Sequence, residues 1–119
     1  MATYVIDIEA NNLLGPALDY SELPYTLKDT FKVWCLVAKN LNTGAVTVVD
    51  IHDSNPREIC RQLFSDATAI VGHNIVGYDL PVLKLYGWLD YTIGYIGEKS
   101  TIFGREVEVY DTLILSKVD

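Results

Sequence analysis

The chain has 119 residues, of which 50% are hydrophobic, and 9 Lys and Arg against 16 Asp and Glu give a formal net charge of −7. This length and composition suit a single domain with a conventional core and argue against two domains. The net negative charge excludes a protein that binds the nucleic-acid backbone through an overall positive charge. A carboxylate-rich site could still bind phosphate groups through bound cations.

The first half of the chain predicts three strands. A β-rich run at 4–9 comes first, and residues 10–30 follow as a loop with Gly and Pro breakers and room for one short helical turn. The β-branched and aromatic runs 31–39 and 45–51 are separated by an Asn- and Gly-bearing turn, which predicts an antiparallel hairpin.

The middle of the chain predicts a helix, a strand and a second helix. Residues 54–58 combine a capping side chain, a proline and a glutamate, so a helix should start there and end near Asp66. The apolar run 69–73 predicts a strand buried on both faces. Residues 78–86 have helical spacing, and Gly87 is a typical helix stop.

The last part of the chain predicts an irregular stretch at 87–104, a strand at 106–110 and a final helix at 111–117, capped by Asp111. We therefore expect a mixed α/β sheet flanked by helices. Its three early strands should be antiparallel, and its later strands, each preceded by a helix, should run parallel. Because no helix breaker precedes the end at 117–119, we expect the sequence to be truncated at its C-terminus.

The sequence carries no sign of export or membrane insertion. No basic segment precedes an apolar stretch at the N-terminus, and no run approaches the ~20 apolar residues that span a bilayer. Cys35 and Cys60 lack metal-ligand spacing, which indicates two reduced thiols. We expect a soluble, cytoplasmic protein without a membrane partner.

Asp7 and Glu9 are the first candidates for chemistry. They stand two positions apart on a predicted strand, so both side chains point to one face, with about 7 Å between their Cα atoms. The pair could be the solvated side of a half-exposed strand, or it could share one or two hard cations. Because the strand should be central, paired charges there need compensation, which favours the cation site.

The second candidate is the junction at 73–79 between a buried strand and a helix. Asp79 would lie in the first helical turn, where the helix dipole favours a carboxylate, or it would complete an oxygen-ligand cluster with Asp7 and Glu9. Asn74 could turn the chain or contact a substrate. His73 is more typical of a hydrogen-bonded structural histidine.

Three stretches together resemble a known family: VIDIEANNLL (5–14), HNIVGYDLPVL (73–83) and YDTLILSKV (110–118). They are similar to the 3′–5′ proofreading exonuclease domain of family A DNA polymerases, especially the phage form. That domain belongs to the DnaQ-like (DEDD) group and has a ribonuclease H-like fold. The run 32–49 also looks like the second and third strands of those domains.

The resemblance implies a site and its cofactors. Asp7, Glu9 and Asp79 match the family's metal ligands and would be catalytic, holding two Mg²⁺ or Mn²⁺ ions in the complete domain. Asp7 would bridge both ions, Glu9 would bind one and orient water, and Asp79 would hold the weaker ion. The partner would be the 3′ end of single-stranded DNA. Substrate contacts are expected from four residues: Ala10, Asn11, Leu13 and Asn74.

Two departures limit what the resemblance implies. Residues 16–29 look like an insertion, and the family's third motif, an Asp with Tyr or His four positions before it, has no match. Asp119 has Leu115 at that position. Residues 1–119 would thus be part of an exonuclease domain, with a polymerase domain following on the missing C-terminal part. We expect this piece alone to be weakly active or inactive, and to reside in the infected host's cytoplasm if it comes from a phage.

Two other interpretations stay open. The chain could be an inactive ribonuclease H-like module retained for metal binding or protein interaction. It could also be another ribonuclease H-like phosphodiesterase, such as a stand-alone exonuclease or a junction nuclease.

Overall fold

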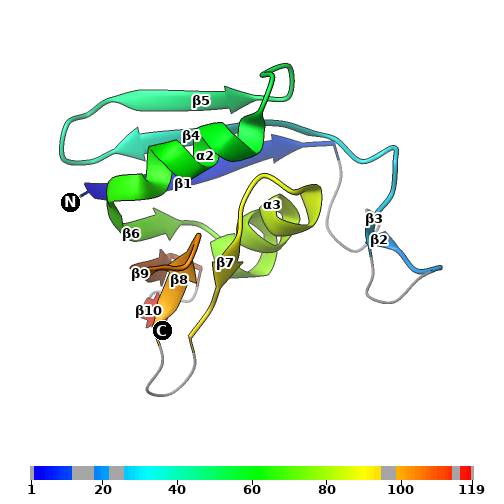
Figure 1. Ribbon diagram of the computed structural model, residues 1–119. Helices are drawn as coiled ribbons and strands as arrows, with labels where there is room; N and C mark the ends of the chain where they lie inside the picture. Colours follow the sequence, from blue (N-terminus) through cyan, green and yellow to red (C-terminus); the bar gives the residue numbers. More distant parts are fainter. Residues whose placement is uncertain (1, 12–17, 22–25, 95–98, 114–115, 119) are drawn as a thin grey trace.

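A single large sheet forms the frame of the protein (Figure 1). The computed structural model describes residues 2–11, 18–21, 26–94, 99–113 and 116–118. Within them the sheet has the strand order β5-β4-β1-β6-β9-β8-β7, with β10 paired to β9, while β2 and β3 form a separate small sheet.

The strands are β1 (Ala2–Ala10), β2 (Leu18–Asp19), β3 (Thr26–Leu27), β4 (Val33–Asn40), β5 (Val46–Asp50), β6 (Ala67–Gly72), β7 (Tyr91–Thr92), β8 (Ser100–Ile102), β9 (Arg105–Asp111) and β10 (Ser116–Val118). The helices are α2 (Pro56–Leu63), the 3₁₀ turn η1 (Phe64–Asp66), the π turn η2 (Ile75–Asp79) and α3 (Leu80–Tyr86).

The strand directions confirm the predicted mixed α/β sheet. β1 pairs antiparallel with β4, and β4 pairs antiparallel with β5. β1 pairs parallel with β6, and β6 pairs parallel with β9. The crossovers through α2 and α3 make these parallel neighbours possible, because a parallel pair needs a long connection.

Strand β1 lies inside the sheet, and its two faces differ. Tyr4, Ile6 and Ile8 are buried in the core, whereas Asp7 and Glu9 on the alternate positions are exposed. A strand places successive side chains on opposite faces, so one face of β1 contributes to the core and the other presents the two carboxylates.

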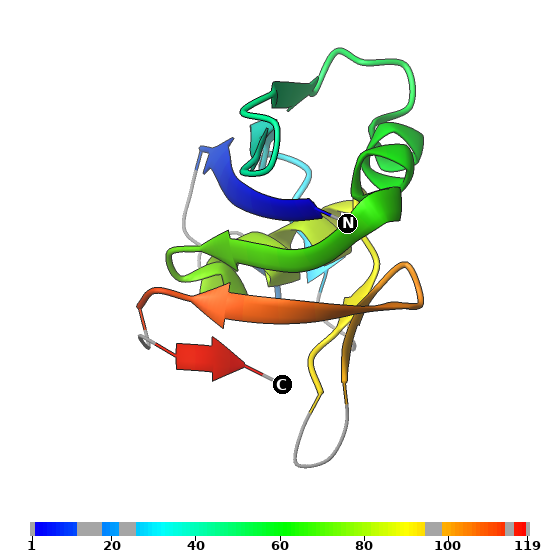
Figure 2. The same cartoon turned by 90° about the vertical axis from the view of Figure 1, so that its left-hand side faces the viewer.

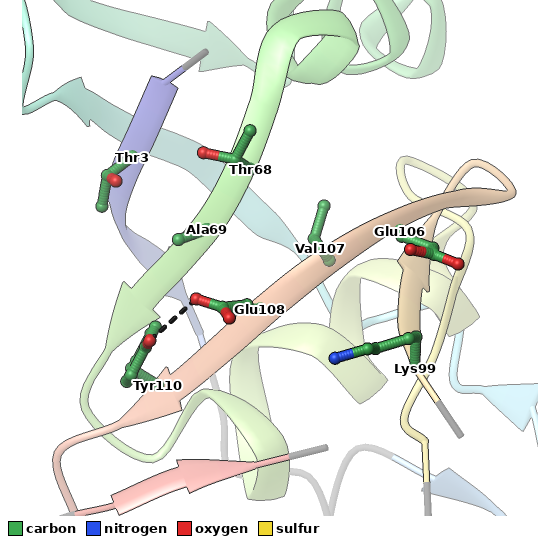
Figure 3. A pocket seen from close by; sticks show the side chains of 8 residues that line it. All are labelled: Thr3, Thr68, Ala69, Lys99, Glu106, Val107, Glu108 and Tyr110. Atoms are coloured by element: carbon green, nitrogen blue, oxygen red, sulfur yellow. Dashed lines mark hydrogen bonds between the residues drawn. The ribbon is translucent and has the colours of Figure 1, made fainter. Parts of the chain in front are cut away.

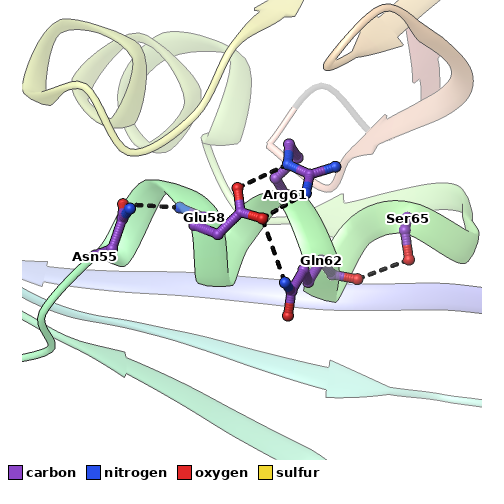
Figure 4. Close-up of polar contacts among 5 residues, drawn as sticks. All are labelled: Asn55, Glu58, Arg61, Gln62 and Ser65. Carbon is purple, nitrogen blue, oxygen red and sulfur yellow. Dashed lines mark hydrogen bonds and ion pairs between the residues drawn. The ribbon is translucent and has the colours of Figure 1, made fainter.

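Helix α2 starts where the sequence predicts. The side chain of Asn55 accepts a hydrogen bond from the backbone N–H of Glu58 at 3.2 Å, and Pro56 occupies the first helical position (Figure 4). An ion pair between Glu58 and Arg61 supports the exposed side. At the other end, the ring of Phe64 meets that of Tyr4 edge-to-face, with centroids 5.4 Å apart. This contact anchors the helix end to β1.

The prediction of an irregular stretch at 87–104 is wrong for its described part, because β7 and β8 lie within it. Strand β8 forms a hairpin with β9 through Phe103 and Gly104, whose φ angles are 49° and 78°. Two positive φ angles are typical of a type I′ turn, which favours Asn-Gly. A phenylalanine at the first position hid this turn in the sequence.

The prediction of a final helix at 111–117 is also wrong. After Asp111 the chain turns, and β10 pairs antiparallel with β9 (Figure 2). The Asp111 carboxylate accepts the backbone N–H of Leu113 at 2.9 Å. An aspartate makes this kind of local bond both at a turn and at a helix start, so the sequence signal was ambiguous.

The predicted loop at 10–30 contains the short strands β2 and β3; residues 12–17 and 22–25, where a helical turn was allowed for, lie outside the described residues. No helix in the described part of the chain has the length and apolar character needed to cross a membrane.

Candidate carboxylate site

Asp79 reaches strand β1 from a π turn. The pairing between β1 and β6 runs from Ala2 to Val5 on the β1 side, and beyond it η2 packs against β1. The Asp79 carboxylate hydrogen-bonds with the backbone of Ile8, which lies between Asp7 and Glu9. Asp79 also stands immediately before α3, where the helix dipole favours a carboxylate, but its side chain makes no capping bond to that helix.

The environment of Asp79 is unusual for a carboxylate. The residue is 4% exposed, and its Oδ2 atom has no hydrogen-bond partner among the described residues. Burial, followed by the charge of Asp7, raises the pKa of Asp79 to about 7, against the opposing effect of the hydrogen bond with Ile8. A buried carboxylate oxygen without a partner costs free energy, so this position calls for a proton or a cation.

Asp7 and Glu9 share their face of the sheet with Cys35 and Asp50. Glu9 stands opposite Cys35 on β4, and Cys35 stands opposite Asp50 on β5. Burial and then the charges of Glu9, Asp50 and Asp7 raise the pKa of the Cys35 thiol. This end of the sheet is therefore a region of concentrated negative charge.

The chemistry of the three candidate ligands suits a hard divalent cation. Carboxylate oxygens are the ligands that Mg²⁺ and Mn²⁺ prefer, and Oδ2 of Asp79, which no described residue hydrogen-bonds, offers one. Within the described residues, however, no three His, Cys, Asp or Glu side chains lie together in an arrangement ready to hold a metal ion. The structure thus associates Asp79 with Asp7, while a complete ligand set stays a prediction.

The expected substrate residues have different surroundings. Asn11 joins the end of β1 to residues 30–32: its side chain donates to the carbonyl of Thr30 and accepts the N–H of Lys32, both at 2.9 Å. Ala10 is half-buried at the end of β1. Leu13 lies outside the described residues. Asn74 adopts a left-handed backbone conformation with a φ of 55°, which turns the chain out of β6.

Two residues around the 73–79 junction hold it in place. His73 Nδ1 lies 3.1 Å from the hydroxyl of Thr112, consistent with a hydrogen-bonded structural histidine. Asp111 is 2% exposed and accepts backbone N–H bonds from Asn74 at 2.8 Å and Val76 at 3.0 Å. Burial alone would raise the pKa of Asp111, but these bonds, with the one from Leu113, lower it.

The role of Asp111 in holding η2 escaped the sequence interpretation, which assigned it to capping its own helix. A signal existed: β9 follows β6 as a parallel neighbour, and the carboxyl ends of parallel neighbours meet at one edge of a sheet. The end of the 106–110 strand could therefore have been placed beside the 73–79 junction.

A cavity of about 430 Å³ lies apart from these carboxylates (Figure 3). It opens between the starts of β1 and β6 and the β8–β9 hairpin, lined among others by Thr3, Thr68, Lys99 and Glu106. Asp7, Glu9 and Asp79 do not line it. The candidate site is thus a group of carboxylates at the carboxyl end of β1 and not this cavity.

The comparisons with known proteins bear on the fold. The chain is similar to part of a family B DNA polymerase from the hyperthermophilic archaeon Pyrobaculum calidifontis, with a TM-score of 0.53 and 20% sequence identity. The match covers 94% of this chain and 15% of the polymerase chain. No family model and no curated protein matches the sequence. The protein thus has a mixed α/β fold of the ribonuclease H-like kind, and that fold also occurs within a DNA polymerase.

Proposed function

We propose that this chain belongs to the 3′–5′ proofreading exonuclease domain of a DNA polymerase and hydrolyses the 3′-terminal phosphodiester of single-stranded DNA with the help of divalent cations. The observation that carries the proposal is the buried carboxylate of Asp79, which meets β1 between Asp7 and Glu9 and whose Oδ2 has no hydrogen-bond partner in the described part of the chain. A fold shared with part of a DNA polymerase supports it.

Asp7, Glu9 and Asp79 would hold the cations. When bound, two Mg²⁺ or Mn²⁺ ions supply Lewis-acid stabilisation of the charge that develops on the phosphodiester oxygens. Glu9 is exposed near the end of β1 and would orient the attacking water. Ala10, Asn11, Leu13 and Asn74 flank these carboxylates in sequence and would contact the terminal nucleotides.

The two exposed carboxylates would have to turn toward Asp79. Without a cation, negative charges at one site repel one another, and exposed side chains on a strand can relieve this by rotating apart. Asp7 and Glu9 are exposed, so their rotation requires no repacking of the core. The proposal therefore requires Asp7 and Glu9 to adopt rotamers that bring their carboxylates toward Asp79.

The phage family A origin is supported by the motif sequences VIDIEANNLL and HNIVGYDLPVL. The matched structure, a family B polymerase, shares the fold at 20% identity. Residues 1–119 contain no match to the family's third motif, which supplies a fourth carboxylate. We therefore propose that these residues by themselves bind cations and DNA but hydrolyse DNA slowly.

Fluorescence anisotropy of a 5′-labelled single-stranded oligonucleotide with a free 3′ hydroxyl tests the proposal. We expect binding in Mn²⁺ that EDTA reverses, with at least about tenfold weaker binding of the same label on a blunt duplex. The variant Asp7→Ala should lose the Mn²⁺-dependent part, whereas Glu106→Gln, an acidic control beside the separate cavity, should retain it.

Two results would overturn the assignment. Binding of Mn²⁺ without any Mn²⁺-dependent binding of DNA would identify an inactive metal-binding module. DNA binding that is equal in the wild type and in Asp7→Ala would mean that the carboxylates have no part in it.

A further inference from the structure

The end of strand β9 forms a clamp on the π turn η2. Asp111 stands beside Gly72, the last residue of β6, and its carboxylate is buried. Oδ1 accepts the backbone N–H groups of Asn74 at 2.8 Å and Leu113 at 2.9 Å, and Oδ2 accepts that of Val76 at 3.0 Å. One side chain on β9 thus satisfies two amides where η2 begins.

These contacts lie on the direct backbone path to Asp79. Asn74 precedes η2 and Val76 is its second residue, while Asp79 is its last. Within the turn, the backbone N–H of Tyr78 donates to the carbonyl of Asn74 at 2.9 Å. The π-helix is rare and appears mostly as single turns, which are frequently found at functional sites.

Thr112 makes two further hydrogen bonds at the connection between β6 and η2. The backbone N–H of Thr112 donates to the carbonyl of Gly72 at 2.9 Å, and its hydroxyl contacts His73 Nδ1 at 3.1 Å. Both ends of the β6–η2 connection are therefore held by residues 111 and 112. This connection determines where η2 leaves the sheet and so where its last residue meets β1.

Asp111 is not suited to replace a missing cation ligand. Both of its oxygens already accept backbone N–H groups, and the residue is 2% exposed. A cation would have to reach a buried carboxylate and compete there with three hydrogen bonds, which is costly. Its role must therefore be exerted through the groups that it binds.

We propose that Asp111 is a positioning residue: its carboxylate fixes the start of the π turn so that the Asp79 carboxylate is presented to β1 beside Asp7. The inference rests on the proposed function only in taking Asp79 as a cation ligand. The positioning itself concerns the apo protein and can be measured without a cation.

The backbone amide of Ile8 reports whether Asp79 is in place, because the two groups are hydrogen-bonded. In ¹H–¹⁵N spectra of the metal-free protein, Asp79→Ala should move the Ile8 signal upfield and so define the undocked position. Asp111→Asn should move this signal in the same direction, since an amide nitrogen cannot accept the N–H of Val76. Val109→Ala, a buried control on the same strand, should leave it unchanged.

Asp111→Glu is a second variant that keeps the charge and displaces it by one methylene. If Asp111→Asn does not fold, this variant tests whether Asp111 positions Asp79. We expect it also to move the Ile8 signal and, like Asp111→Asn, to weaken Mn²⁺ binding about tenfold, as loss of a supporting residue does at metal sites. An unmoved Ile8 signal in folded Asp111 variants would overturn the positioning role even if Mn²⁺ binds. A moved signal in a protein that binds no Mn²⁺ would support that role and overturn the proposed function.

Discussion

A carboxylate that is buried without a full set of partners has a strained electrostatic position. Asp79 has one hydrogen bond from β1 and the charge of Asp7 nearby, and its Oδ2 remains without a partner among the described residues. Proteins neutralise such groups by protonation or by a bound cation. The properties of this single residue therefore link the stability of the chain to its proposed chemistry.

The stability of the metal-free chain should fall as pH rises because of Asp79. Its pKa increases from 3.8 to about 7 on folding, so between these values the folded state binds more protons than the unfolded state. At about 1.4 kcal/mol per pH unit, the loss amounts to at most about 4 kcal/mol at pH 8.

Asp79→Asn, which cannot ionise, should lack this loss. Urea unfolding in EDTA at pH 4 and pH 8 gives the free energy of unfolding of both proteins. At pH 4 the free energy of the variant should lie within about 1 kcal/mol of the wild-type value, and at pH 8 the variant should be the more stable protein. Parallel pH dependences for the two proteins would contradict the raised pKa.

Cys35 can report cation binding at its neighbours. The charges of Glu9, Asp50 and Asp7 add to burial in raising its pKa, so a cation held by Asp7 and Glu9 should lower that pKa and speed alkylation by iodoacetamide. Buried Cys60, whose pKa burial raises to about 12, should not react in the folded chain.

The measurement is the rate of carbamidomethylation at pH 8 with and without Mg²⁺. In Asp7→Ala the added Mg²⁺ should have no effect. An Mg²⁺-independent rate in the wild type would argue against a cation beside Cys35.

At the scale of elements, the close approach of β6, η2 and β1 depends on Gly72. A Cβ atom there would overlap the Cγ2 atom of Ile75 and lie 2.9 Å from the backbone oxygen of Ile6. No side chain larger than hydrogen fits without moving the π turn away from β1.

Gly72→Ala should therefore destabilise the fold by about 1–3 kcal/mol, in the range of other overpacked core sites. It should also weaken Mn²⁺ binding, because η2 carries Asp79. Thermal unfolding and calorimetry check both, with the exposed Lys39→Ala on β4 as a control expected within about 0.5 kcal/mol of the wild type. If Gly72→Ala is as stable as the wild type, the contact between β6, η2 and β1 can accommodate a methyl group, which would contradict this prediction.

The sequence predicted those elements whose signals are local and strong. The cap at Asn55, the Asn- and Gly-bearing hairpin turn and the stop at Gly87 all have side chains or φ angles that the structure uses as expected. The π turn was not predicted, because the side chain that accepts hydrogen bonds from its first amides belongs to Asp111, which is distant in sequence. The β8–β9 turn was not predicted, because Phe103 adopts a positive φ that its side chain does not favour.

The sequence predicted only part of the arrangement of the candidate carboxylates, because a local pattern places residues along one strand but not contacts between distant segments. The period of two along a strand placed Asp7 and Glu9 on one exposed face, as observed. That Asp79 is buried and meets Ile8 depends on where β6 diverges from β1, which no local pattern encodes. Whether Asp7, Glu9 and Asp79 act together on a cation remains a prediction.

At the scale of the whole molecule, the strand order and directions agree with the mixed sheet predicted from the order of elements. A chain with a net charge of −7 has no general attraction for DNA. In the proposed function, attraction to a DNA 3′ end therefore relies on cations held at the carboxyl end of β1. Cation binding is the claim on which the proposed function depends.

Calorimetric titration with Mn²⁺ tests that claim most directly. We predict saturable heat in the wild type, its loss in Asp7→Ala and Glu9→Ala, and its retention in Glu106→Gln. Equal heats in the wild type and in both carboxylate variants, or no heat in any of them, would contradict a cation site on these residues.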